Sequence, residues 1–358
     1  MPTVREIAKQ AGVANSTVSL VMNNKAGVSE KTRQLVLNAY NDLSSKEDNG
    51  TSLSKKASGL FSLENNDNKK PLTFVVYHPA ILNSSQVFSD LLKGIQDAAD
   101  LFHAQLRLAI NEQKISSDHV SNLYLQDPKL QPDGILIIGA HEKEPILEEA
   151  TRQKIPYVLV SRTTSDPSIT AVGRDEVKIT HEAVNYLIGL GHSSIGFVGG
   201  NPDFSYTNQR IKGYRQALIE NGITPLDRWI AVGSGKKAAQ SIIKNSPEIT
   251  AVIMVNDSYA MEALEIFKNA GYKIPENLSI ISFDDTDEAQ NFNPPLTSIQ
   301  NPRYEEGVWA VRMLVEKIRN PLMAGCQLIL KSTLIIRDSC TRPNINKQAQ
   351  VIKGGGTK

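Results

Sequence analysis

Cysteine is scarce in this sequence, with only Cys326 and Cys340 among 358 residues. Long proteins built for oxidising compartments usually carry more, so we expect two reduced thiols without a structural role. Long apolar runs are also missing. None approaches the roughly 20 residues of a membrane span, and the amino-terminal MPTVREIAKQAG lacks the apolar core of a signal peptide. These absences predict a cytoplasmic protein without a membrane partner.

Catalytic and metal-binding patterns are absent as well. The six histidines show neither an H-E-x-x-H motif nor paired Cys/His spacing. The sequence contains no G-x-x-x-x-G-K-[ST] phosphate loop and no dinucleotide-binding G-x-G-x-x-G pattern. No nucleophile has a matched base in its local sequence, and His192 is expected to bond backbone at a helix-to-strand turn. We therefore predict no catalytic residues, no metal, no cofactor and no enzymatic activity.

A strong charge imbalance is the third absence, because the net charge is only +1. The distribution is mildly uneven. Residues 1–58 carry eight Lys/Arg and five Asp/Glu, a net of +3, and the remaining 31 basic and 33 acidic residues give −2. Bulk charge alone therefore does not indicate nucleic-acid binding. At roughly 100–200 residues per domain, the length predicts two or three domains.

Three short helical patterns are present at the start of the chain. Thr3 can cap a first helix, which Gly12 ends. Asn15 or Ser16 can cap a second helix, and Ser29 a third. Apolar residues follow each cap at helical spacing: Val4, Ile7, Ala8 and Ala11, then Val18, Val21 and Met22, then Leu35, Val36, Ala39 and Leu43.

The first two helical patterns have the properties of a helix-turn-helix. Ala8 is small, so a second helix can approach the first closely, and Gly12 permits the positive φ of a tight turn. Short polar residues at the start of the second helix could meet base edges and phosphates. These are Asn15, Ser16, Thr17 and Ser19.

From Leu72 onward, apolar strand-like runs alternate with helical segments. This alternation predicts parallel sheets with helices on both faces. About 270 residues exceed one open sheet of ordinary size, so two similar lobes are expected, with a ligand at the carboxyl ends of the strands. The predicted strands cover 72–77, 105–110, 134–139, 156–160, 194–199, 250–255 and 278–283, and a helix covers about 86–103.

The amino-terminal stretch resembles the lactose-repressor/galactose-repressor family of bacterial regulators. The matching pieces are I-A-x-x-A-G-V, S-T-V-S-x-V-M-N and V-S-x-K-T-R. The resemblance implies that Asn15, Ser16 and Leu20 face bases in the major groove. It implies phosphate contacts for Thr3, Val4, Thr17, Ser19, Asn23 and Thr32. Many relatives have Arg at the position of Leu20, so we expect the operator to differ at that base pair.

Residues 45–71 are rich in Ser, Asn, Lys and Gly and are predicted to form a linker. Relatives carry a helix here that inserts Leu into the minor groove and kinks the DNA. Leu53, flanked by Lys55 and Lys56, fits a degraded version of that helix, but a plain linker fits equally well. Both interpretations stay open.

The resemblance continues to about Pro343. Residues 190–200 match L-G-H-x-x-I-x-F-I-G-G, and residues 210–218 match R-x-x-G-Y-x-x-A-L. The implied effector contacts are Arg210, Asn256 and Asp284, with Asp175 as a weaker candidate and Phe88, Ser161 and Arg162 from the other lobe. Arg donates, Asp accepts and Asn does both, which suits a polyhydroxylated ligand such as a sugar.

One departure lies beside Asp175. Glu176 stands where relatives commonly have Asn, and Arg174 precedes the aspartate. A charged pair here could suit a modified or acidic ligand, but solvated surface charges are the commoner explanation.

Together these observations predict a small all-α helix-turn-helix head plus an α/β periplasmic-binding-protein-like domain of two parallel-sheet lobes. The expected function is a transcription repressor that binds double-stranded operator DNA as a homodimer under control of a sugar-like effector. A solute-binding protein, or an enzyme with a fused head, is the alternative. The predicted parts are the DNA-binding domain 1–44, the linker 45–71, the two-lobed effector-binding and dimerisation domain 72–343 (first lobe about 72–172 plus 301–327, second about 173–300 plus 328–343) and a flexible tail 344–358.

Overall fold

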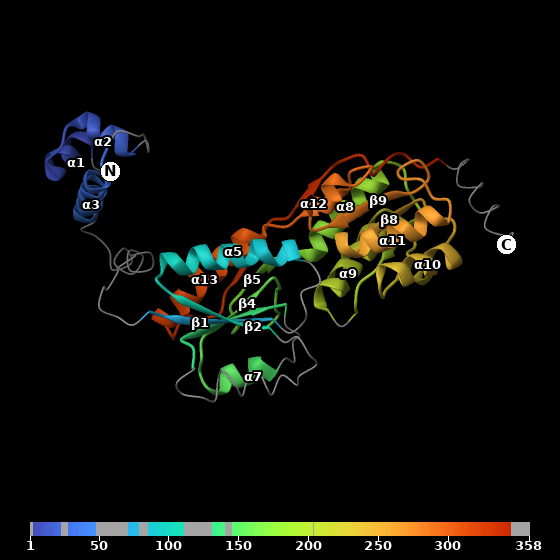
Figure 1. Ribbon diagram of the computed structural model, residues 1–358, viewed down its shortest axis with the longest axis horizontal. Coiled ribbons are helices and arrows are strands. Elements are labelled where there is room, and N and C mark those ends of the chain that lie inside the picture. Colours follow the sequence, from blue (N-terminus) through green and yellow to red (C-terminus); the bar gives the residue numbers. More distant parts are fainter. Residues whose placement is uncertain are drawn as a thin grey trace. The chain divides into compact units, whose positions relative to one another are not determined.

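The computed structural model describes residues 3–22, 28–47, 71–78, 85–110, 131–139, 145–202 and 204–344. Contacts divide the chain into two units, residues 1–69 and residues 70–358, whose elements are labelled in Figure 1. Each unit has a hydrophobic core of its own. The predictions for Asn23, for Leu53 and for most of the linker and tail fall outside the described residues.

The first unit is a bundle of three helices, α1 (Val4–Ala11), α2 (Asn15–Met22) and α3 (Glu30–Glu47). Gly12 ends α1 in the left-handed conformation, with φ of +66°, and donates its N–H to the carbonyl of Ala8. This is the tight turn that the sequence predicts. The helices share one small core of Ile7, Ala8, Val18, Val21, Val36 and Ala39.

The start of α2 differs from the prediction. The N–H groups of Thr17 and Val18 donate to the carbonyl of Ala14 at 2.9 and 3.3 Å. Ala14 therefore precedes the helix, and Asn15 and Ser16 are helical residues rather than its cap. The prediction for α3 holds, because Ser29 Oγ accepts the N–H of Thr32 at 3.2 Å.

Thr3 fixes the start of α1 through two reciprocal hydrogen bonds. Its Oγ1 accepts the N–H of Glu6 at 3.4 Å, and its own N–H donates to the Glu6 carboxylate at 2.7 Å. Thr3→Ala should destabilise the head by about 1 kcal/mol and speed amide exchange in α1 roughly fivefold. Ser16→Ala, at an exposed position of the same bundle, is the control and should leave exchange in α1 unchanged. Equal protection in both variants would contradict a capping role.

The first lobe of the second unit contains a six-stranded parallel sheet in the order β11-β5-β4-β3-β1-β2. Helices cover both faces, α5 (Ser85–Leu101) and α13 (Arg303–Arg319) on one and α7 (Pro145–Arg152) on the other (Figure 1). Both faces are buried, which explains the continuous apolar runs of the central strands. The strands are β1 (Thr73–His78), β2 (Gln105–Ile110), β3 (Gly134–Ile138), β4 (Tyr157–Val160), β5 (Ala171–Arg174) and β11 (Gln327–Leu330).

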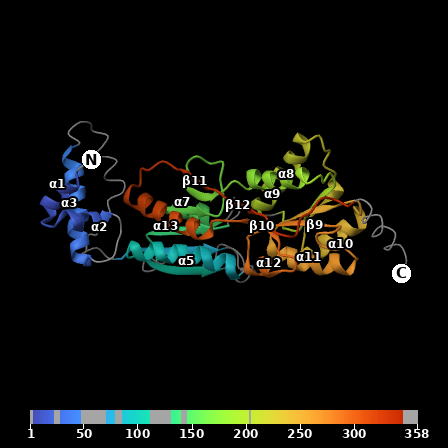
Figure 2. The same ribbon diagram turned by 90° about the horizontal axis from the view of Figure 1, so that it is seen from above.

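The second lobe repeats this plan with the strand order β12-β10-β9-β8-β6-β7. Figure 2 shows α8 (Glu176–Gly189) and α9 (Ser205–Glu220) on one side of the sheet, opposite α10 (Gly235–Asn245) and α11 (Asp257–Asn269). The edge strand β12 runs antiparallel to β10, so this sheet is not wholly parallel as predicted. The remaining elements are β6 (Ile195–Val198), β7 (Ile230–Ala231), β8 (Ala251–Met254), β9 (Ser279–Phe283), β10 (Thr297–Gln300), β12 (Thr333–Ile335), the 3₁₀ turn η1 (Asp227–Trp229) and α12 (Asp287–Asn291).

The chain crosses between the lobes three times, from β5 to α8, from β10 to α13 and from β11 to β12. The pairing of β5 and β11 within the first sheet moves two predicted boundaries. The first crossing follows Arg174 rather than residue 172, and the last follows Leu330 rather than residue 327. All three crossings leave at the carboxyl end of a strand, so they gather at one edge of each sheet.

Two glycines let α5 and α13 approach closely. A Cβ at Gly94 would lie 2.0 Å from the carbonyl oxygen of Tyr304, and one at Gly307 would lie 2.4 Å from that of Leu91. Neither distance is compatible with a side chain at unchanged helix positions. The first-lobe core therefore depends on the absence of a side chain at both positions.

Among the described residues, no helix is long and apolar enough to cross a membrane.

Candidate functional site

The second helix of the head presents a polar face. Asn15, Ser16 and Ser19 are exposed, whereas Val18 and Val21 on the opposite face are buried in the head core. Residues three and four positions apart share one helix face. The structure therefore places the predicted base-facing Asn15 and Ser16 beside the predicted phosphate contact Ser19.

The other predicted head contacts lie mainly at helix starts. Thr3 is engaged in the α1 cap, and Val4 beside it is 44% exposed. The Thr32 hydroxyl lies 2.8 Å from that of Ser29 in the first turn of α3. Thr17 and Leu20 on α2 are half-buried. Helix starts offer backbone N–H groups suited to phosphate oxygens.

In the second unit, three predicted effector residues lie within two positions of a strand end, at the edge where the chain changes lobes. Ser161 follows β4 and Asp284 follows β9, both with positive φ, at 62° and 100°. Asn256 follows β8, and its Oδ1 accepts the N–H of Tyr259 at 3.0 Å to cap α11. The sequence predicts strand ends or helix starts for Asn256, Asp284 and Arg210, and the structure agrees for the first two, whereas Arg210 lies inside α9 (Ser205–Glu220).

Arg210 comes from α9 and is buried beneath this edge. Its Nε donates to Glu176 at 2.7 Å, and its Nη1 donates to the carbonyl of Val255. The guanidinium lies 3.7 Å from the ring centroid of Phe283 and 5.2 Å from that of Tyr206. The orientation of the Arg210 guanidinium is thus fixed by a carboxylate, a carbonyl and two aromatic rings.

Glu176 holds two arginines together. Besides Arg210, it accepts from Arg174 through Nε at 3.2 Å and Nη2 at 2.9 Å. Burial by itself would raise the pKa of Glu176, but Arg210 and Arg174 outweigh it and lower the pKa to about 2. Glu176 is therefore a charged group at neutral pH. The prediction of solvated surface charges was wrong, because Arg174 and Glu176 are only 4% and 5% exposed.

The first lobe contributes a second carboxylate, Glu306 of α13, which is fully buried. It accepts from the Ser161 hydroxyl at 2.9 Å and from Arg174 Nη1. Arg303 Nη1 lies 3.6 Å from the same carboxylate, and Arg303 Nη2 donates to Asp284 at 3.0 Å. These bonds connect α13 of the first lobe to the strand end at β9 of the second.

The bonds continue through all three crossings. Asn301, after β10, donates to Asp284 at 3.0 Å and accepts from the Ser332 hydroxyl at 2.8 Å. Ser332 lies between β11 and β12, and Arg174 ends β5. One chain of hydrogen bonds and ion pairs, which we call the interlobe charge chain, therefore runs Arg210–Glu176–Arg174–Glu306–Arg303–Asp284–Asn301–Ser332.

Five predicted effector residues are not members of this chain, although Ser161 donates to its Glu306 and Asn256 caps α11 beside it. The other three lie elsewhere. Asp175 is exposed and caps α8 by accepting the N–H of Lys178 at 2.8 Å. Phe88 packs against the first-lobe core. Arg162 is buried, and its Nε lies 3.4 Å from the carbonyl of Thr163. Sequence reasoning missed Arg303, Glu306 and Asn301 as site residues.

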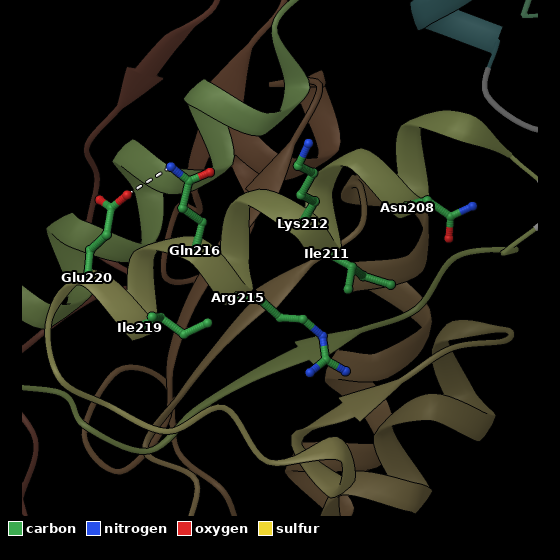
Figure 3. A pocket seen from close by; sticks show the side chains of 7 residues that line it. All are labelled: Asn208, Ile211, Lys212, Arg215, Gln216, Ile219 and Glu220. Atoms are coloured by element: carbon green, nitrogen blue, oxygen red, sulfur yellow. Dashed lines mark hydrogen bonds between the residues drawn. The ribbon is translucent and has the colours of Figure 1, made fainter.

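Two surface hollows differ in their relation to the interlobe charge chain. One, of about 390 Å³, is lined by Asp284, Asn301 and Arg303 together with Asp90 and Lys331. The other, of about 530 Å³, lies along the outer face of α9 and contains none of the predicted effector residues (Figure 3). There Arg215 pairs with Asp227, and Glu220 accepts from Gln216. The smaller hollow is the better candidate for a ligand site, because the chain opens onto it.

Comparison with known proteins accounts for both units. Residues 3–44 match bacterial regulatory proteins of the lacI family, and residues 184–340 match a periplasmic binding protein-like domain. The HTH-type transcriptional regulator DegA of Bacillus subtilis is 30% identical over 353 residues, which cover 96% of this chain and 99% of DegA. The chain belongs to the lacI family of bacterial regulatory proteins. It is a DNA-binding transcriptional regulator with a helix-turn-helix head, as the sequence predicts.

Other relatives of this lacI-family regulator agree. The repressor CytR of Escherichia coli K12 is 30% identical over 342 residues, covering 94% of this chain and 96% of CytR. A solved lacI-family regulator from Enterococcus faecium is 25% identical, with a TM-score of 0.65 over 76% of this chain and 100% of that one. The lac repressor dimer bound to operator, 21% identical with a TM-score of 0.67 over 95% and 99%, shows the same fold. The predicted fold class is therefore confirmed.

Proposed function

We propose that this lacI-family regulator represses genes of carbohydrate use in the cytoplasm, binding operator DNA as a homodimer under control of a small sugar. The exposed polar face of α2 carries the DNA-binding part of the proposal. Its Asn15 and Ser16 reach outward from a helix whose other face is buried. The curated relatives are regulators rather than enzymes, and we propose that this protein likewise acts by affinity rather than by turnover.

We propose a sugar as the effector because of the chemistry of the interlobe charge chain. Carboxylate, amide and guanidinium groups converge at Asp284, Asn301 and Arg303 beside a hollow of about 390 Å³. Sugar hydroxyls both donate and accept, so they match such a mixture. The related Enterococcus faecium regulator was solved with bound ribose, which supports the same ligand class here.

Control of DNA binding requires the effector to bind two states of the protein unequally. The proposed states differ in the angle between the lobes, since the interlobe charge chain joins both. A two-fold dimer suits near-palindromic operators because each head then reads one half-site. We propose that the effector releases the protein from DNA.

The head assignment is tested by two alanine variants and an operator selected from a randomised duplex pool. Asn15→Ala should weaken operator binding about tenfold or more while leaving binding to random duplex unchanged, because Asn15 is assigned a base contact. Ser19 is assigned a phosphate contact, so Ser19→Ala should weaken binding to both duplexes by the same factor. The measurement is fluorescence anisotropy at several salt concentrations. Equal losses on both duplexes for Asn15→Ala would remove it from base reading.

The effector class is tested by thermal shift against sugars, sugar phosphates, nucleobases and amino acids. A ligand that binds only the folded state raises apparent stability by RT ln(1 + [L]/Kd). We expect the melting temperature of the second unit to rise with at least one sugar, and that sugar should change operator affinity. Stabilisation by a purine or an amino acid alone would overturn the sugar.

A further inference from the structure

We propose that the effector site at the interlobe charge chain selects an effector of zero net charge, and that Glu176 imposes this selection by neutralising Arg210. This proposal rests on the proposed function, because it takes the sheet edge where the chain changes lobes as the effector site. It specifies the charge class of that effector and the residue responsible. The observation behind it is the alternation of charges along the interlobe charge chain.

The chain contains as many positive as negative side chains. Its cations are Arg210, Arg174 and Arg303, and its anions are Glu176, Glu306 and Asp284. Each cation contacts at least one anion, and the sum is zero. Within the chain the charges are therefore balanced, and Arg210 has its counter-charge in Glu176 before any ligand enters.

These groups are removed from water, so the balance matters. The side chains of Arg210 and Glu176 are 2% and 6% exposed, and Glu306 is fully buried. Inside a protein, an added charge without a partner keeps its full desolvation penalty. An anionic ligand would add a negative charge next to Glu176 and Glu306, and a cationic ligand would add one next to the three arginines. A neutral ligand avoids both penalties.

The geometry at Arg210 shows how an anion is excluded. A guanidinium binds carboxylate and phosphate through its N–H edges. Glu176 takes the Nε edge, the Val255 carbonyl takes Nη1, and Phe283 covers one face of the group. Glu176 thus occupies the Nε edge of Arg210, at which an oxygen of a phosphate or carboxylate would otherwise bind.

The remaining hydrogen-bonding capacity suits hydroxyl groups. Among the described residues, Arg303 Nε and Thr207 Oγ1 are buried without a hydrogen-bond partner. Arg303 lines the hollow of about 390 Å³, and Thr207 lies one helical turn before Arg210 on α9. A hydroxyl can accept from the first and can exchange either kind of bond with the second. Neither contact requires a charge on the ligand.

The deciding experiment compares the wild type with Glu176→Gln in the full-length protein. Inorganic phosphate and glucose 6-phosphate are the anionic probes, and glucose is the uncharged one. Binding is followed at constant ionic strength through tryptophan fluorescence during thermal unfolding. Both tryptophans, Trp229 and Trp309, lie in the second unit, so anions on the head are not registered. Glu176→Gln preserves the shape and removes the charge, and should increase phosphate affinity at least tenfold.

The double variant Glu176→Gln/Arg210→Gln is the matched control. It restores the zero sum and should bind phosphate no better than the wild type. An equal gain in both variants would overturn the assignment to Arg210. If Glu176→Gln fails to fold, Glu306→Gln provides the same test at Arg174, and the wild type must in any case bind neither anion at 1 mM. Tight binding of an anion by the wild type would overturn the proposal.

The experiments distinguish failure of the sugar effector from failure of the charge rule. A wild type that binds no sugar, together with a gain of phosphate binding in Glu176→Gln, would overturn the sugar effector and support neutralisation of Arg210 by Glu176. A wild type that binds sugar phosphate and releases DNA would support an effector-controlled regulator and overturn the charge rule.

Discussion

Glu306→Ala is expected to lower the free energy of unfolding of the second unit by about 3–5 kcal/mol. The substitution leaves the buried Arg174 without one of its two carboxylates and the Ser161 hydroxyl without its acceptor. Both effects act in the same direction, because a buried polar group that loses its partner keeps its desolvation cost. Urea unfolding followed by tryptophan fluorescence measures the change.

Glu316→Ala on the same helix is the matched control. Glu316 forms an ion pair with Arg319 at 3.8 Å, and both side chains are partly exposed, at 27% and 43%. Exposed pairs of this kind contribute about 0–1 kcal/mol. If the two variants were destabilised equally, Glu306 would contribute no more to stability than an exposed ion pair does.

The second large effect is expected at the contact between α5 and α13. Gly307→Val should destabilise the first lobe by about 3 kcal/mol or more, because the new side chain meets the backbone of Leu91 and Ile95. The helices can accommodate it only by separating, which opens the core between them. Gly307→Ala should have the same sign and a smaller size.

Gly189 provides the control with the same chemistry. It is an exposed residue in the last turn of α8, and a Cβ there meets nothing within 4 Å. Gly189→Ala should therefore stabilise the protein by about 0.5–1 kcal/mol through the unfolded chain. Opposite signs at the two glycines would confirm that close approach, and not helix propensity, determines the effect at Gly307. Stabilisation by Gly307→Ala would refute it.

The long central strands could be predicted because both of their faces are buried. β1 and β3 read as unbroken apolar runs for this reason. The strands without a prediction are short or carry polar ends, as in β5, which closes on Arg174, and β10, which closes on Gln300. β7 has only two residues. Such segments become strands because a neighbouring strand offers hydrogen bonds. That neighbour is distant in the sequence, so the local sequence does not predict the strand.

The same distinction between local and distant information applies to the candidate site. Arg210, Asn256 and Asp284 could be predicted because each belongs to a local motif. Glu306 could not, since its partner Arg174 is 132 residues away in the sequence. In isolation, Arg303-Tyr304-Glu305-Glu306 looks like the solvated first turn of an ordinary helix. Burial of such charges is a property of the assembled lobes, so only the structure identifies them.

The three crossings between the lobes limit how a ligand can act. The last one leaves beside β5 and enters beside β10, so the connecting segments are held next to each other. A polypeptide cannot be stretched appreciably, and parallel tethers therefore block sliding and resist twisting. Bending remains, because it needs only small changes of φ and ψ at a few positions. Effector chemistry can determine whether this joint flexes, but its covalent tethers determine the direction. Different ligands at the interlobe charge chain would therefore drive motion about one common axis.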